Sequence, residues 1–338
     1  MWSKAKRDRG TPSLREPEAQ SPNPAVDVVP RTNLVPRADP PESMGWLSSR
    51  PIIVGDPTPE FEPSAVSNGY RRTPYRPDTV IDGWSHGGFT IRAASLRGHL
   101  HRYNGAPRQD DLAITVPGDR GRLAIAVADG VSAARHSHIG STAAVRYATQ
   151  WLESEATGEL SDIAWRSLFE NTAWTLIEHA ATVLSTPDTD AAQAELALAT
   201  TLTCVVCEAN NDGTLSAVIA GVGDSGAWLL SDGVFHPVWG GKEPTDAGLT
   251  SSAVSGLPRV PDDIRPVELV IWPGDVLLVG TDGFGDPLGG GTGVVGGLFR
   301  DTLAHRVPAP IEFAHVLDFS RETFDDDRTL VAVWPSGG

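Results

Sequence analysis

The sequence predicts an α+β fold in which strands and hairpins dominate and helices pack outside the sheets. Short apolar or β-branched runs recur from Gly88 to the C-terminus, and several are separated by Asn, Asp or Gly residues typical of turns. Two long segments with helical apolar spacing lie next to each other in the middle of the chain. Because these helices do not alternate with the strands, the pattern favours the α+β class.

The predicted elements follow in order along the chain. The first strands are 89–95, 112–116 and 123–128, and they are followed by helices at 139–154 and 162–184, which carry apolar stripes. Three pairs of runs flank turn residues and are predicted to be hairpins: 201–208 with 214–220, 227–230 with 234–238, and 266–272 with 275–280. A helix at 311–322 precedes the last strand, 329–334.

Composition divides the chain into two parts. Residues 1–80 hold 14 of the 27 prolines and show neither helical nor strand periodicity. Such a segment buries too little apolar surface to offset its ordering entropy. We therefore predict a Pro-rich, largely disordered N-terminal arm, 1–84, followed by one folded domain, 85–338. The apolar stretches 26–29 and 46–54 are candidates for docking on a partner or on the domain, although a solvated tail is the preferred interpretation.

Charge and cysteine content restrict the function classes. The first 80 residues are nearly neutral, whereas residues 81–338 hold 16 Lys and Arg against 33 Asp and Glu. An acidic domain repels nucleic acid and anionic membranes, so neither is an expected partner. The chain has only two cysteines and no apolar run typical of a secretory signal or a membrane span. We expect a cytoplasmic monomer.

Four acidic motifs lie beside apolar strands and suggest a metal site. They are Gln109-Asp110, Ala128-Asp129-Gly130, Thr281-Asp282-Gly283 and Asp326-Asp327. Each motif alone is an ordinary turn sequence. If the fold gathers them, the carboxylates will raise each other's pKa values unless cations are bound. Because Mg²⁺ and Mn²⁺ prefer oxygen ligands, the pattern predicts a multi-metal hydrolase.

The order of the motifs resembles that of the metal-dependent protein phosphatases of the 2C type. Two further motifs of that family, Thr200-Thr201-Leu202 and Gly223-Asp224-Ser225, lie between the second and third acidic motifs, and Arg328-Thr329 completes the last one. The resemblance covers about residues 88–336. It implies a four-layer αββα sandwich of two antiparallel β-sheets flanked by helix pairs, with a metal pair at one edge.

The resemblance also implies roles for individual residues at a site for two Mn²⁺ or Mg²⁺ ions. Asp129 would bridge both ions, and the carbonyl of Gly130 would bind the second. Asp282 and Asp326 would hold the first ion, while Asp110 would support the second through water. A water activated by the ions would hydrolyse phosphoserine or phosphothreonine on signalling proteins, with a Ser/Thr protein kinase as the functional counterpart.

The sequence departs from the family pattern at the phosphate clamp. The family often has an Arg five positions before the Asp of its first motif, and here that position is Gly105. His101 and Arg102 are the candidate clamp residues, and Arg108 lies nearby. The departure keeps open a catalytically weak pseudophosphatase that acts as a binding or regulatory module. A metal hydrolase acting on a different phosphoester is a third alternative.

Three smaller features carry expectations of their own. Asp327 stands where the last family motif usually has Asn. His136 and His138 are expected in an exposed loop, with a place near the leaving group as the alternative. The glycine-rich segment 291–296 is expected to form a flap beside the metal site, because a nucleotide-binding fingerprint would need a strand directly before it.

Overall fold

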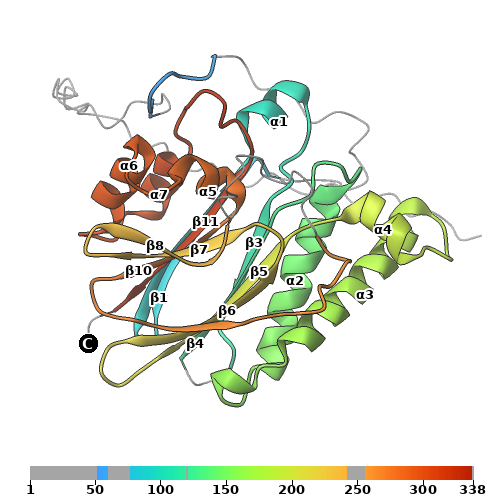
Figure 1. The fold of residues 1–338 in the computed structure, drawn as a ribbon, viewed down its shortest axis with the longest axis horizontal. Coiled ribbons are helices and arrows are strands. Elements are labelled where there is room, and N and C mark those ends of the chain that lie inside the picture. Colours follow the sequence, from blue (N-terminus) through green and yellow to red (C-terminus); the bar gives the residue numbers. More distant parts are fainter. Residues whose placement is uncertain (1–51, 60–76, 119–120, 242–255, 337–338) are drawn as a thin grey trace, which may run out of the picture. The chain divides into compact units, whose positions relative to one another are not determined.

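The computed structural model describes residues 52–59, 77–118, 121–241 and 256–336, all of which belong to one compact unit. Within these residues the chain forms two antiparallel β-sheets with helices on both outer sides (Figure 1). Most of the predicted arm, including the apolar stretch 26–29, lies outside the described residues, and only residues 52–54 of the second stretch lie inside them.

The first sheet has six strands in the order β1-β2-β11-β10-β7-β8. Their bounds are β1 Thr79–His86, β2 Phe89–Leu96, β7 Gly226–Ser231, β8 Val234–Gly240, β10 Val276–Gly280 and β11 Arg328–Pro335. The domain boundary predicted between residues 84 and 85 therefore falls inside β1, which pairs along its whole length with β2. The folded sheet begins at Thr79, and the polar residues and the glycine of β1 obscure the strand pattern.

The second sheet has five strands in the order β3-β4-β5-β6-β9. Their bounds are β3 Asp111–Thr115, β4 Arg122–Ala128, β5 Leu202–Ala209, β6 Leu215–Val222 and β9 Val267–Ile271. The predicted hairpins β5–β6 and β7–β8 are confirmed. The third predicted hairpin is wrong, because β9 pairs with β6 while β10 pairs with β7 and β11 in the other sheet. The turn at Pro273-Gly274 thus carries the chain between the sheets.

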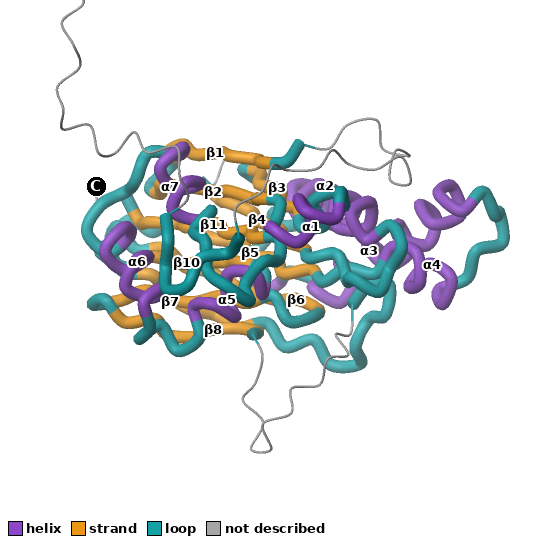
Figure 2. Tube along the Cα trace, turned by 90° about the horizontal axis from the view of Figure 1, so that it is seen from above, coloured by secondary structure: helices purple, strands orange, loops and turns teal. Residues whose placement is uncertain are grey.

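Helices cover the outer faces of both sheets (Figures 1 and 2). On the side of the five-stranded sheet lie α2 Ser137–Glu155, α3 Trp165–Leu184, α4 Ala191–Leu198 and the short 3₁₀ helix η3 Leu160–Asp162. On the other side lie α5 Asp282–Leu288, α6 Val294–Leu303 and α7 Pro310–Leu317, and α1 His99–Asn104 follows β2. The helix predicted at 311–322 ends at Leu317, and the chain continues as a loop towards Asp326. No helix in the described part of the chain is long and apolar enough to cross a membrane.

Three apolar layers separate these four layers of backbone. Along β4 the side chains alternate, so that Leu123, Ile125 and Val127 face the other sheet while Ala124 and Ala126 face α2 and α3. A third cluster fills the space between the six-stranded sheet and α5–α7. The expected four-layer αββα sandwich is confirmed.

Candidate metal centre

Strand register places the acidic motifs at matching strand ends. In the five-stranded sheet Asp111 pairs with Ala128, so Asp110 and Asp129 lie just beyond the same end of β3 and β4. In the six-stranded sheet β10 and β11 are antiparallel neighbours, with Gly280 paired to Leu330. The start of β11 therefore lies beside the end of β10, which brings the last two acidic motifs together.

The charges show that all four motifs meet at one place. Burial raises the pKa of Asp129 well above its ordinary value, and the charges of Asp110, Asp282 and Asp326 raise it further. Burial and the charges of Asp327 and Asp326 likewise raise the pKa of Asp110 well above normal. Burial and the neighbouring Asp327 charge raise the pKa of Asp326 to about 6. Such crowding is what a divalent cation relieves, and carboxylate oxygens are the donors that Mg²⁺ and Mn²⁺ prefer, so the residues present fit the implied ions.

The backbone of Asp129 is fixed by the Thr200-Thr201 motif. The Asp129 carbonyl accepts hydrogen bonds from the Thr201 amide (2.7 Å) and from Thr200 Oγ1 (2.8 Å). The Asp129 amide donates to Thr201 Oγ1 (2.9 Å), which in turn shares a 2.9 Å hydrogen bond with Ser225 Oγ. The two family motifs that carry no expected metal ligand thus hold the central aspartate in place.

Gly130 follows Asp129 where α2 comes closest. A Cβ on Gly130 would lie 2.7 Å from Cβ of Ser137, the first residue of α2. Only glycine allows this approach without a shift of the helix. The close packing against α2 therefore explains the glycine at position 130, in addition to the expected role of its carbonyl as a metal ligand.

Asp110 is held from both sheets. Thr281 Oγ1 donates a 2.8 Å hydrogen bond to Asp110 Oδ2, which ties the first motif to the third. The Arg108 guanidinium donates to the carbonyl of Asp110 (2.7 Å) and to Ser95 Oγ, and it pairs with Asp111 at 3.3 Å. Arg108 is 2% exposed. It is a buried support for the first motif.

Asp327 binds the chain segment that precedes the first motif. Its Oδ1 accepts a 2.6 Å hydrogen bond from the Gly98 amide and lies 2.9 Å from His101 Nδ1. Its Oδ2 accepts a hydrogen bond from the Gln109 amide. Burial by itself would raise the pKa of Asp327, but His101 and these amides lower it below its ordinary value. Asp327 therefore fixes the position of His101 and of the backbone on both sides of it.

Two glycines press against the backbone of the last motif. A Cβ on Gly98 would overlap the backbone of Asp326, and a Cβ on Gly283 would overlap the carbonyl oxygen of Asp327. Gly283 in Thr281-Asp282-Gly283 thus serves a close approach of two chain segments. Close approaches of this kind connect motifs that are distant in sequence. They cannot be predicted from the sequence of either motif alone.

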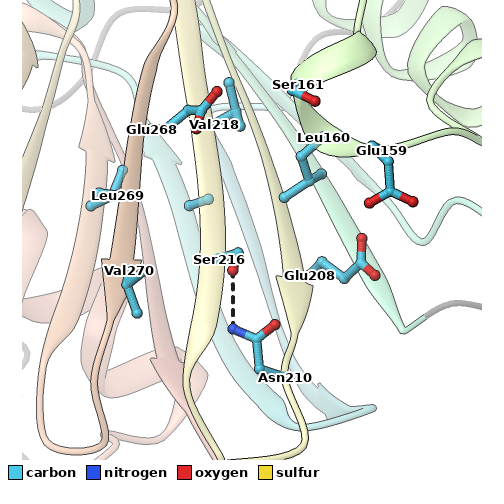
Figure 3. A pocket seen from close by; sticks show the side chains of 11 residues that line it. Glu159, Leu160, Ser161, Glu208, Asn210, Ser216, Val218, Glu268, Leu269 and Val270 are labelled. Carbon is cyan, nitrogen blue, oxygen red and sulfur yellow. Dashed lines mark hydrogen bonds between the residues drawn. The ribbon is translucent and has the colours of Figure 1, made fainter.

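A cavity of about 250 Å³ opens at the carboxylates. It is lined by Asp282, Gly283, Asp286, Pro287, Thr323, Phe324, Asp325 and Asp326. A larger hollow of about 560 Å³ lies on the helix side of β5, β6 and β9, where it is lined by Glu159, Glu208 and Glu268 and by the hydrogen-bonded pair Asn210 and Ser216 (Figure 3). None of the four acidic motifs lines that hollow, so the smaller cavity is the candidate reaction centre.

The candidate clamp residues differ in their surroundings. His101, Asp326 and Asp327 place potential ligand atoms within 4.8 Å of one another, so His101 lies at the carboxylate group. Burial by itself would lower the pKa of His101, but the hydrogen bond and charge of Asp327 raise it above its ordinary value. Arg102 instead pairs with Asp78 at 3.4 Å and with Asp318 at 3.1 Å.

Two expectations from the sequence are wrong. His136 and His138 are buried at the start of α2, where the His136 amide donates to the carbonyl of Ala197 (2.7 Å), so they are not exposed loop residues. The glycine-rich segment does not form a free flap, because Gly291 packs against Phe235, where a Cβ would overlap the side chain, and α6 begins at Val294. In both cases a tertiary contact decides the environment of a segment whose local sequence is typical of a loop.

Comparison with known proteins identifies the class. The model of the protein phosphatase 2C family matches residues 97–310, more than half of the chain, and the chain belongs to this family. A serine/threonine phosphatase from S. agalactiae is 17% identical and covers 73% of this chain and 99% of its own, with a TM-score of 0.53. A bacterial serine phosphatase is 16% identical and covers 73% and 98%, with a TM-score of 0.51. At these identities the similarity shows the fold, and no curated protein sequence matches the chain. The predicted family resemblance is confirmed.

Proposed function

We propose that the chain is a metal-dependent protein serine/threonine phosphatase that works with two Mn²⁺ or Mg²⁺ ions. The observation that carries the proposal is the convergence of Asp110, Asp129, Asp282 and Asp326 from four separate motifs. Burial and neighbouring charges raise the pKa values of Asp110, Asp129 and Asp326, and bound cations would relieve this crowding. Membership of the protein phosphatase 2C family supports the same reaction.

Each residue of the centre has a role in this proposal. Asp129 and the carbonyl of Gly130 would hold the second ion, with Asp110 supporting it through water, while Asp282 and Asp326 join Asp129 at the first. When bound, the two ions supply an acidified water and offset negative charge on the phosphoryl oxygens.

In this proposal His101 would contact the phosphoryl oxygens. Its Nδ1 faces Asp327, which leaves Nε2 as the atom for a phosphate contact. The raised pKa of His101 favours the imidazolium form, which donates charge-assisted hydrogen bonds.

The proposed substrates are phosphoserine and phosphothreonine on proteins, and a Ser/Thr protein kinase acting on the same sites would be the functional counterpart. The acidic domain disfavours nucleic acid or an anionic membrane as partner. A cytoplasmic, monomeric protein remains the expectation from the sequence.

A second candidate is a pseudophosphatase that keeps the fold as a binding module. The arrangement of the arginines favours it, because Gly105 replaces the usual clamp and Arg102 and Arg108 are both engaged in ion pairs. The two candidates differ in whether a bound cation leads to turnover.

Hydrolysis of a phosphothreonine peptide by the full chain separates them. We expect turnover with Mn²⁺, its loss with a chelator and its loss in Asp282→Asn, while Asp301→Asn, an exposed carboxylate on α6, retains it. Mn²⁺ binding by calorimetry without turnover would favour the binding module. Absence of Mn²⁺ binding would overturn the metal centre itself.

A further inference from the structure

Residues 52–59, which we call the strap, run beside the loop that leads from α7 to Asp326. The Val54 amide donates a 3.0 Å hydrogen bond to the carbonyl of Ser320, and the Ser320 amide donates a 2.8 Å hydrogen bond to the carbonyl of Ile52. The two segments are parallel at this point. The strap therefore adds a short piece of sheet to the loop.

The contact continues towards the metal centre. The Thr58 amide donates a 3.0 Å hydrogen bond to Ser320 Oγ, and the Glu322 amide donates a 2.7 Å hydrogen bond to the carbonyl of Asp56. Glu322 precedes Asp326 by only four residues. The strap thus fixes the backbone shortly before a proposed metal ligand.

Val54 anchors the strap in the protein. Its side chain is 4% exposed and belongs to the apolar cluster between the six-stranded sheet and α5–α7, which also contains Leu317 and Phe319. Complete burial of a Val side chain contributes about 1.5–3 kcal/mol. The neighbouring Ile53 points outward and is 59% exposed, so the strap binds through one face.

The loop is attached to the rest of the fold at both ends. The buried Arg328 guanidinium donates to the carbonyl of Phe319 at the start of the loop and to the carbonyl of Phe324 near its end, and it lies over the Phe319 ring, 3.9 Å from its centroid. At its end the Leu100 amide donates a 2.9 Å hydrogen bond to the carbonyl of Asp325. The strap holds the stretch between these attachments, and that stretch contributes Thr323 and Phe324 to the cavity at the carboxylates.

We infer that the strap positions Asp326 and thereby sets the affinity of the first cation site. The inference rests on the proposed metal centre, since it concerns the position of Asp326, one of the proposed ligands. Loss of a group that hydrogen-bonds directly to a metal ligand commonly changes metal affinity by about 10- to 100-fold, and the strap acts one step further away, through the backbone that precedes Asp326. Residues 1–51 lead directly into the strap at Ile52. The N-terminal part of the chain is therefore joined to the segment that fixes the backbone before a proposed metal ligand.

Substitution at adjacent strap positions tests the inference in the full chain. Val54→Asp places a charge in the apolar cluster and should release the strap, whereas Ile53→Asp alters an exposed side chain and is the matched control. We expect Val54→Asp to weaken Mn²⁺ binding by about tenfold in calorimetry and to speed amide exchange at Ser320 and Glu322. Ile53→Asp should leave both measurements unchanged.

A second pair of variants avoids damage to the apolar cluster. Gly55 has φ +72°, and a Cβ there would meet nothing within 4 Å, so Gly55→Val strains only the strap backbone. Gly274→Val, at φ +99° in an equally open turn, is the control. Faster amide exchange at Ser320 in Gly55→Val, with Mn²⁺ affinity within twofold of wild type, would overturn the inference while leaving the metal centre intact. Wild-type protein that binds no Mn²⁺ would overturn both.

Discussion

His101 and Asp327 form an ion pair at the carboxylate group, with Nδ1 2.9 Å from Oδ1. The same carboxylate accepts hydrogen bonds from the amides of Gly98 and Gln109, so it fixes both ends of the segment that carries the histidine. The Asp that replaces the usual Asn of the last family motif therefore provides the charge that holds His101.

Replacement of His101 tests its role at the phosphate. We expect His101→Ala to raise KM for a phosphothreonine peptide by about tenfold or more with a smaller change in kcat, because a hydrogen bond to a charged group contributes about 1.5–3 kcal/mol. Leu100→Ala, an exposed residue of the same helix, is the control for structural damage. An unchanged KM in His101→Ala would remove His101 from the clamp and strengthen the pseudophosphatase alternative.

Thr201, which directly precedes β5, and Thr203, within that strand, offer a matched comparison for the support of Asp129. Thr201 Oγ1 is bonded to the Asp129 amide and to Ser225, whereas Thr203 Oγ1 is buried without a hydrogen-bond partner among the described residues. Thr201→Val should lower the free energy of unfolding by about 1–3 kcal/mol and weaken Mn²⁺ binding, while Thr203→Val should be neutral or stabilising. Chemical denaturation and calorimetry of both variants check this, and equal losses would contradict it.

Gly283 and Gly290 allow a test of the close approach between the third and fourth motifs. A Cβ at 283 would overlap the carbonyl of Asp327, whereas one at 290 would meet nothing within 4 Å. Gly283→Ala should therefore destabilise the protein by about 3 kcal/mol and weaken Mn²⁺ binding, and Gly290→Ala should do neither. Thermal unfolding with and without Mn²⁺ measures both effects. If Gly283→Ala melted like wild type, the packing of Gly283 on Asp327 would be wrong.

Much of the fold could be predicted because the buried strands are long apolar runs. β4 and β11 are buried at every position, and the stripes of α2 and α3 are equally clear. The helices α1, α4, α5 and α6 span only six to ten residues each, too few for a reliable stripe. The pairing of β9 and β10 with different sheets depends on long-range contacts, which the Pro273-Gly274 turn does not encode.

Only the residues of the acidic motifs could be predicted to belong to the site. The carboxylates can be recognised in the sequence because each Asp follows or precedes an apolar strand. The structure brings Asp110, Asp129, Asp282 and Asp326 together. The supporting contacts lie in unremarkable sequence because they join distant segments: Ser95 Oγ shares a hydrogen bond with Thr329 Oγ1, and the strap at 52–59 pairs with Ser320, each more than 200 residues away. No local pattern reveals such contacts.

Asp326 gives the metal-free protein a pH dependence with a definite sign. Its pKa in the folded protein is raised to about 6, so the carboxyl group favours folding in its protonated form. This contribution is fully present below the unfolded value of about 4 and is lost as the pH rises through 6. In chelator, the melting temperature of Asp326→Asn relative to wild type should therefore increase between pH 4 and pH 7. With Mn²⁺ at pH 7, wild type should instead melt at a higher temperature than Asp326→Asn, because only wild type keeps the metal ligand. A difference that is flat from pH 4 to 7 in chelator would show that Asp326 is not crowded by its neighbours.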